Sequence, residues 1–287
     1  IRRQRQMCIR DSARPTALLS ASLTLALGIW ALVSFDGCSS CWSRFEGMDL
    51  QLTLAPALSK VMLLLTILVT FATVLGTNPP QGGEASWYNS ALLISAGATG
   101  AFLSDNIISF FAFHELALIP TFVMIGLYGR GDRRTTAWRA TLYLGLASMV
   151  LLAALLMIGT QAGFTFSGLK DFMASGRELA HAELIGALLI AGFGTLISLF
   201  PFHSWAAPAY ASAPAPVAMM HAGVLKKFGL YGLFMFQPLM ETGFLPWTNI
   251  LLVLLVCNVI WVGYVTVNQK RLDLLLGNSS VMHMGYI

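Results

Sequence analysis

Long apolar runs, separated by short polar segments, restrict what this chain can fold into more than any other feature. Hydrophobic residues make up 56% of the sequence and charged residues only 10%, with a mean hydropathy of +0.72. A soluble globular domain carries roughly 25% charged residues. So few charges cannot cover a soluble surface, but they suit a chain whose outer surface faces lipid. The sequence therefore predicts a polytopic membrane protein.

The length of these runs and their continuous hydrophobicity predict helices. Crossing a hydrocarbon core of about 30 Å takes about 20 apolar residues, and about nine runs approach that length. An open chain in lipid satisfies its backbone amides only as helices, and the runs lack the alternation of barrel strands. The predicted fold class is all-α, a transmembrane helical bundle over residues 13–287. The expected spans are residues 17–35, 58–75, 88–103, 107–128, 140–158, 184–202, 217–236, 250–267 and 272–287.

The ends of the chain and its cysteines support narrower predictions. Residues 1–12 are polar, do not begin with Met, and give way to apolar sequence at Ala13, so we expect a foreign, non-helical segment there. The other end stops inside an apolar run, and we expect native spans to be missing. Cys38 and Cys41 form a CxxC that lacks the further ligands of a structural zinc site, so a disulfide or an incidental pair is expected. Cys257 is expected to be a small packing residue.

Loop charges predict the orientation of the chain. Taking alternate loops, one side carries Arg130, Arg133, Arg134, Arg139, Lys270 and Arg271, and the other carries Arg44, Lys60, Lys170 and Arg177. The positive-inside rule places the arginine-rich side in the cytoplasm. By alternation, residue 13 and the loop at residues 204–216 are also expected to be cytoplasmic.

Three charged residues lie where a membrane helix rarely carries them. Glu115 follows Asp105 by about ten residues, which places it about 15 Å deep, near the bilayer midplane. Lys226 and Lys227 lie at a similar depth in the seventh expected span. Each such charge costs about 2.5–3.5 kcal/mol, so these residues are predicted to face an interior cavity and to be functional. A buried structural ion pair is the alternative. Adjacent helical residues differ by about 100°, so the two lysines are expected to have different surroundings.

Histidines lie beside these charges. His114 precedes Glu115, His221 precedes the two lysines, and His283 lies in the ninth expected span. Because the intrinsic pKa of histidine is near 6.5, such residues can relay protons at neutral pH. In a regular helix His221 would share a face with neither lysine. For His114 and His221, the alternative is a hydrogen-bonded packing histidine.

The stretch FPFHSWAAPAYASAPAPV interrupts the helical pattern. Its prolines, at positions 201, 208, 214 and 216, remove backbone donors and hinder helix continuation. Interrupted helices at membrane depth line cavities or are buried in protein, and transporters build ion sites from them. A break near residues 201–216 is therefore predicted, with an ordinary proline-rich loop as the alternative.

Several motifs resemble the proton-translocating, antiporter-like family that includes subunit M of NADH-quinone oxidoreductase, the bacterial respiratory complex I. They are FHELALIPTF, PFHSW, HAGVLKKFGLYGL and QKRLDLLLGNSSVMHMGY, in the family's order. The likeness runs from about Leu50 to Ile287 and extends to cation/proton antiporters and membrane hydrogenases. It implies inverted helical repeats with two broken helices, and its topology agrees with the loop charges.

The resemblance also implies roles in proton translocation. Glu115 matches the family's essential glutamate, Lys227 its channel lysine, and His283 the histidine of a later channel helix; His203 is the histidine of PFHSW. The family's usual lysine, seven residues before that histidine, is replaced here by Leu196. Lys226, His114 or His221 could substitute for it.

These observations predict a proton-translocating membrane subunit of an NADH:quinone oxidoreductase. The chain itself is expected to hold no cofactor, because it contains neither a GxGxxG motif nor Fe–S cysteine spacing. NADH and quinone would be bound by other subunits, its expected partners are those membrane subunits and lipid, and its expected location is the bacterial inner membrane. The alternatives are a cation/proton antiporter or membrane hydrogenase subunit, and a non-pumping structural spacer.

Overall fold

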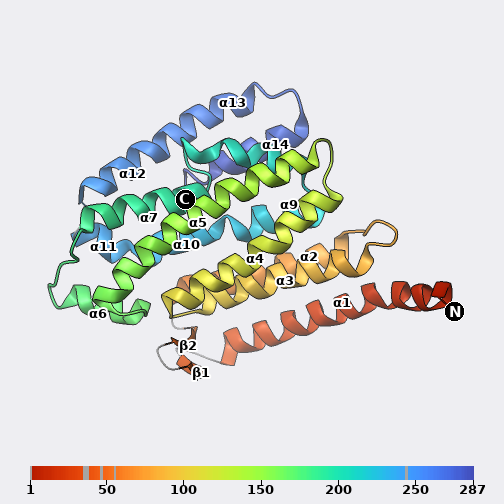
Figure 1. The fold of residues 1–287 in the computed structure, drawn as a ribbon, viewed down its shortest axis with the longest axis horizontal. Helices are drawn as coiled ribbons and strands as arrows, with labels where there is room; N and C mark the ends of the chain where they lie inside the picture. The colour runs from red at the N-terminus through yellow and green to blue at the C-terminus, as the bar shows by residue number, and fades with distance from the viewer. Residues whose placement is uncertain (1, 35–38, 46–47, 55, 243–244) are drawn as a thin grey trace.

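The computed structural model describes residues 2–34, 39–45, 48–54, 56–242 and 245–287 of the chain. Figure 1 shows a bundle of long helices that run roughly side by side, with the N-terminal helix at one edge and the α12–α13 segment at the opposite edge. Among the described residues, five helices are long and apolar enough to cross a membrane. The predicted all-α bundle of a multi-pass membrane protein is therefore confirmed.

The first half of the bundle consists of long helices. They are α1 (Arg2–Ser34), α2 (Ala57–Gly76), α3 (Glu84–Leu103), α4 (Ile107–Tyr128) and α5 (Arg133–Ala162). Side-chain caps set where two of them start. The Asn106 side-chain oxygen accepts hydrogen bonds from the Ile108 and Ser109 amides, and the Asp132 carboxylate accepts one from Thr135. The cap on α4 fixes the depth of Glu115, which lies on that helix.

The predicted proline-associated break is confirmed and starts earlier than expected. Helix α7 (Ala182–Leu196) ends before the expected end of the sixth span at residue 202. It ends there because Ser198 adopts a positive φ of 62° and Pro201 follows. A short 3-10 turn, η1 (Phe202–Trp205), and a short helix, α8 (Ala206–Ser212), then carry the chain across the break.

The seventh and eighth expected spans are each divided by a π-helical segment. The seventh comprises α9 (Ala215–Met220), η2 (His221–Leu225) and α10 (Lys227–Met235). The eighth comprises α12 (Leu245–Cys257), η3 (Asn258–Val262) and α13 (Gly263–Val267). Single π turns inside α-helices occur frequently at functional sites. The sequence did not predict either segment.

Smaller elements occupy the connections. The strands β1 (Ser39–Phe45) and β2 (Met48–Thr53) form an antiparallel hairpin where only a loop was expected, and the short helices α6 (Phe166–Ala174) and α11 (Gln237–Thr242) lie in later connections. Helix α14 (Leu272–His283) lies in the ninth expected span. Cys38 lies outside the described residues, and the side chain of Cys41 on β1 is not described either. The pairing of these cysteines therefore stays a prediction.

The N-terminal segment is helical, so the expectation of a non-helical start was wrong. Helix α1 begins at Arg2, and its apolar part, Ala13–Ser34, begins where the composition changes. Arginine and glutamine have good helix propensity, so a polar segment joined to an apolar helix can extend it. The foreign origin of residues 1–12 stays a prediction.

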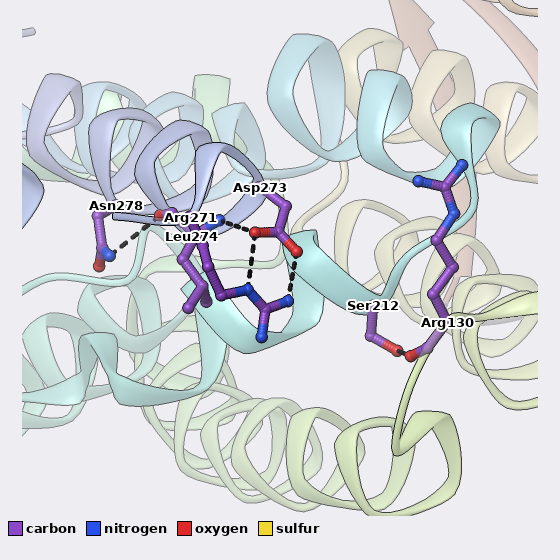
Figure 2. A network of polar contacts seen from close by, with 6 residues as sticks. All are labelled: Arg130, Ser212, Arg271, Asp273, Leu274 and Asn278. Carbon is purple, nitrogen blue, oxygen red and sulfur yellow. Dashed lines mark hydrogen bonds and ion pairs between the residues drawn. The ribbon is translucent and has the colours of Figure 1, made fainter. Parts of the chain in front are cut away.

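Contacts between loops agree with the predicted assignment of the loops to the two ends of the bundle, and which end is cytoplasmic stays a prediction. On the arginine-rich side, the Arg130 amide donates to the Ser212 carbonyl (2.7 Å), and the Ser212 hydroxyl donates to the Arg130 carbonyl (2.8 Å; Figure 2). On the opposite side, Asn106 pairs with Thr165 in a β-bridge. Loops assigned to one side by charge thus contact each other.

An exposed ion pair marks the arginine-rich end of α14. Two nitrogens of the Arg271 guanidinium donate to the two carboxylate oxygens of Asp273, with the shorter distance 2.5 Å (Figure 2). The pair places the carboxylate of Asp273 in the first turn of α14, where a negative charge interacts favourably with the helix dipole.

The outer surface of the bundle is apolar. On α1, Leu19, Leu23 and Leu27 recur every four residues and are all exposed. Another exposed apolar group lies on the opposite edge of the bundle; it comprises Leu252, Val253, Val256, Ile260, Trp261 and Val267. Apolar faces on both edges suit a bundle surrounded by lipid.

Candidate functional site

Glu115 and His221 line one cavity, although they lie far apart in the sequence. The cavity has a volume of about 150 Å³, lies mainly between α4 and α5, and is partly open. Its walls are otherwise largely apolar, with Leu118, Leu144 and Gly145 among them. A space of this size next to polar groups can hold several water molecules. The arrangement places the mid-membrane carboxylate and an imidazole around one volume.

His114 is the nearest charged or polar neighbour of Glu115 on α4. Its Nδ1 lies 3.2 Å from Glu115 Oε1, within ion-pair distance, but the angles are not those of a hydrogen bond. The His114 ring is 2% exposed and makes an edge contact with Phe228, with ring centroids 5.1 Å apart. His114 therefore packs in the core, whereas the side chain of Glu115 is 33% exposed and reaches the cavity.

The π segment brings His221 and Lys226 together. The Lys226 amide donates to the His221 carbonyl, five residues back, at 3.3 Å. In a regular helix the bond would run four residues back, and the two side chains would diverge. The expectation that His221 shares a face with neither lysine was therefore wrong, because it assumed regular helical geometry.

Tyr210 of α8 lies against both residues. The Lys226 ammonium lies over the Tyr210 ring at 4.7 Å from its centroid, a cation–π contact, and the His221 and Tyr210 rings pack edge to face at 5.8 Å. Lys226 is only 1% exposed, and within the described residues its Nζ has no hydrogen-bond partner. In the described part of the chain, the cation–π contact with the Tyr210 ring is thus the main favourable electrostatic contact of the Lys226 ammonium.

Lys227 has different surroundings from Lys226, as the angle between neighbouring residues predicted. It is partly exposed, and its Nζ donates a short hydrogen bond to the Ala222 carbonyl at the start of the π segment. That carbonyl belongs to the irregular backbone, where a π turn frees acceptors that a regular helix would use. One lysine is therefore enclosed, and the other is hydrogen-bonded and accessible.

A chain of polar contacts continues from Tyr210 to the C-terminal helices. The Ser280 hydroxyl of α14 donates to the Tyr210 hydroxyl at 3.2 Å. The buried Asn258, which opens the π segment η3, accepts from the Phe200 amide (3.1 Å) and donates to the Val281 carbonyl (2.9 Å). Both broken segments and α14 thus meet around one group of polar side chains.

The other predicted residues lie apart from this group. His203 stacks on Phe200, with ring centroids 5.6 Å apart, in the 3-10 turn. His283, the last residue of α14, is exposed, and its Nδ1 lies 2.6 Å from the Ser279 carbonyl oxygen. Leu196, at the position of the family's usual lysine, is 4% exposed and belongs to the apolar core. The structure thus joins His221 to Lys226 and to the cavity of Glu115, but leaves His203 and His283 outside.

Three polar residues of the site were not predicted. The sequence predicted a proline-rich break in the segment that holds Tyr210, and apolar membrane spans in those that hold Asn258 and Ser280. A signal existed for Asn258, because it is an amide inside the otherwise apolar run at residues 250–267. Nothing in the spacing indicates Tyr210, whose role depends on how α8 folds back against η2.

The described residues gather no metal-ligating group. No three His, Cys, Asp or Glu side chains among them lie close enough to hold a metal ion. The groups that the site does offer are a carboxylate, an imidazole, two ammonium groups and a phenol. These groups can carry charge or exchange protons, which is acid–base chemistry in a membrane interior.

Comparison with known proteins identifies a family and relatives of this chain. Residues 104–287 match the protein family described as "NADH:quinone oxidoreductase/Mrp antiporter, TM". The chain is 32% identical, over 237 residues, to NAD(P)H-quinone oxidoreductase chain 4 2 of Microcystis aeruginosa. That match covers 80% of this chain and 42% of the relative, so the chain spans less than half the length of this relative.

Solved structures share the fold. A chain of respiratory complex I from Thermus thermophilus with bound NADH superposes with a TM-score of 0.83 and 25% identity, covering 95% of this chain and 58% of that one. A chain of the Mrp complex from Dietzia sp. gives a TM-score of 0.82 at 22% identity, covering 95% of this chain and 31% of that one. The second likeness concerns the fold alone.

Proposed function

Because this chain belongs to the NADH:quinone oxidoreductase/Mrp antiporter family of transmembrane proteins, we propose that it is a proton-translocating membrane subunit of an NADH:quinone oxidoreductase. The observation that carries the proposal is the cavity lined by both Glu115 and His221, with Lys226 adjoining His221. A carboxylate at mid-membrane depth next to a space that can hold water is suited to exchange a proton. Oxidation of NADH and reduction of quinone belong to other subunits in this proposal.

The proposed route runs from Glu115 across the cavity to His221 and the lysine pair. Glu115 is the input group, because a change in its charge acts on cations across a largely apolar space where screening is weak. Lys227 is the proton-carrying group, since it is accessible and matches the family's channel lysine. Lys226 is the fixed neighbour whose charge repels that of Lys227 and whose position the Tyr210 ring holds.

Leu196 gives the route its distinguishing feature. With an apolar residue at that position, no ion pair with a lysine is found at Glu115 among the described residues, and His114 lies within ion-pair distance of it. We propose that His114 and His221 take over the electrostatic role of the usual lysine. His203 and His283 would act further along the path.

Two other functions remain as candidates. The first is a subunit of a cation/proton antiporter, favoured by the shared fold with the Mrp complex. The second is a structural spacer without pumping, favoured by Leu196. Both would retain the bundle, but an antiporter would move protons in exchange for another cation, whereas a spacer would move none.

Reconstitution of the intact complex into liposomes separates these functions. With NADH and a quinone supplied in sodium-free buffer, the proposal predicts a pH gradient that collapses with a protonophore. Proton movement driven by a sodium gradient without NADH would instead identify an antiporter. A gradient unchanged by the combined Glu115→Gln and Lys227→Ala substitutions would identify a spacer.

A further inference from the structure

A second cavity lies at the arginine-rich end of the bundle, away from Glu115. It has a volume of about 490 Å³ and opens where the C-terminal ends of α2 and α4 meet the starts of α3, α5 and α9. Residues from all of these segments line it, among them Thr77, Trp87, Tyr128, Arg130, Arg133 and Pro214. Loop charges place this end at the cytoplasmic surface of the membrane.

Two guanidinium groups supply the cavity with positive charge. Arg130 is held through its backbone by Ser212, and Figure 2 shows its side chain extending away from that contact. The Arg133 guanidinium donates one hydrogen bond to the Leu127 carbonyl, which leaves further donors. Within the described residues, neither guanidinium forms an ion pair with a carboxylate. The site therefore offers uncompensated charge with several donors.

The nearby carboxylates form no ion pair with these arginines in the described part of the chain. Asp132 lies between the two arginines in sequence, and its Oδ1 accepts a hydrogen bond from the Thr135 amide at the start of α5. Glu84 lies one turn before Trp87 on α3 and does not line the cavity. A further cation borders the site, because an Arg14 nitrogen lies 3.4 Å from the Leu75 carbonyl oxygen, beside the cavity residue Gly76.

Two aromatic rings, those of Trp87 and Tyr128, form part of the cavity wall, and the leucines Leu75 and Leu127 form an apolar rim beside it. The Trp87 and Tyr128 rings pack edge to face at 5.4 Å, and the Trp87 indole donates to the Thr77 hydroxyl at 3.2 Å. Such pairs are typical of the membrane–water interface. Leu127 lines the cavity, Leu75 directly precedes the cavity residue Gly76, and their side chains are 54% and 51% exposed. Cationic donors thus lie next to an apolar surface.

We propose that this cavity binds the headgroup phosphate of an anionic phospholipid. Basic pockets between transmembrane helices on the cytoplasmic side bind such headgroups. Arg130 and Arg133 would hold the phosphate oxygens, and Trp87 and Tyr128 would pack on the glycerol region. The acyl chains would lie along Leu75 and Leu127. The apolar rim favours a lipid over a soluble phosphate, which would use the charges alone.

Native mass spectrometry of the intact complex tests this site. The complex is titrated with phosphatidylglycerol, phosphatidylcholine or inorganic phosphate. The proposal predicts preferential retention of phosphatidylglycerol, and a weakening of about 30-fold in the Arg130→Gln/Arg133→Gln variant. The Arg130→Lys/Arg133→Lys variant keeps the charges and should retain most of the binding, which controls for misfolding.

The matched control is Arg271→Gln, on the same side of the membrane but already paired with Asp273. It should leave lipid retention unchanged. Equal retention of phosphatidylglycerol by the double glutamine variant would overturn the proposal. So would competition by inorganic phosphate at lipid concentrations, or a protein segment of another subunit found cross-linked to Arg130.

Discussion

Lys226 lies where a charge is most costly, and its neighbours show how the chain accommodates it. A cation at a helix centre costs about 2.5–3.5 kcal/mol on insertion scales. Here the Tyr210 ring faces the ammonium at 4.7 Å, and desolvated cation–π contacts are worth about 2 kcal/mol. Lys227 instead uses the carbonyl of Ala222. Adjacent lysines thus reach different environments because the π segment and α8 supply different partners.

The first prediction concerns these two lysines. Lys227→Ala should reduce protons pumped per electron more than Lys226→Ala does, because only Lys227 combines accessibility with the channel position. Lys226→Met keeps most of the side-chain volume and separates loss of charge from loss of packing. The readout is proton uptake or release in the reconstituted complex, normalised to NADH oxidation. A larger loss in both Lys226 variants would assign the proton to Lys226.

Asn258 gives a second prediction at the scale of a single side chain. Asn258→Leu keeps the side-chain size but leaves the Phe200 amide without its acceptor, and the Val281 carbonyl keeps only its bond from the Met284 amide. An unpaired buried polar group costs about 1–3 kcal/mol, so thermal unfolding in detergent should occur at a clearly lower temperature. Thr160→Val is the control, because it removes an exposed hydroxyl bonded within its own helix. Equal melting temperatures for the two variants would show that Asn258 does not tie η3 to the break.

At the scale of elements, the break holds its position through close packing of α7 against α10. Gly229 of α10 lies so close to α7 that an added Cβ would be 2.8 Å from the Phe193 carbonyl oxygen and 2.4 Å from Ile197 Cγ2. The carbonyl cannot move without disturbing α7. Contact between the helices at this position therefore requires glycine.

The third prediction uses this contact. Gly229→Ala should destabilise the protein by about 1–3 kcal/mol, the usual cost of overpacking, as measured by chemical or thermal unfolding. Gly145→Ala is its matched control in α5, because an added Cβ there meets nothing within 4 Å. That variant should be neutral or slightly stabilising, since alanine favours a helix by roughly 0.5–1 kcal/mol. Indistinguishable stabilities would contradict the close approach.

The sequence predicted the positions of the helices better than it predicted the π-helical segments that interrupt them. Apolar runs located the helices because lipid leaves the backbone few alternatives, and prolines located the break between α7 and α9. The π segments at His221 and Asn258 could not be predicted, because a one-residue change in hydrogen-bond register depends on neighbouring helices. The same limit explains why Glu115, Lys226 and Lys227 were predicted while the pairing of His221 with Lys226 was missed.

For the whole molecule, the described residues form one bundle with two polar regions of different character. The Glu115 cavity lies beside the middle of α4 and is also lined by His221, whereas the Arg130 cavity opens at the arginine-rich end of the bundle. We propose proton transfer for the first region and binding of a lipid headgroup for the second. Substitutions in one region should therefore leave the other intact.

Proton pumping by a Glu115→Gln complex tests the central claim most directly. Gln keeps the size of the side chain and removes its charge and its proton, so the complex should assemble to near-normal levels while protons pumped per electron fall. Glu183→Gln, an exposed substitution in the first turn of α7, is the control and should pump normally. An assembled Glu115→Gln complex that pumps as many protons per electron as the wild type would contradict the account.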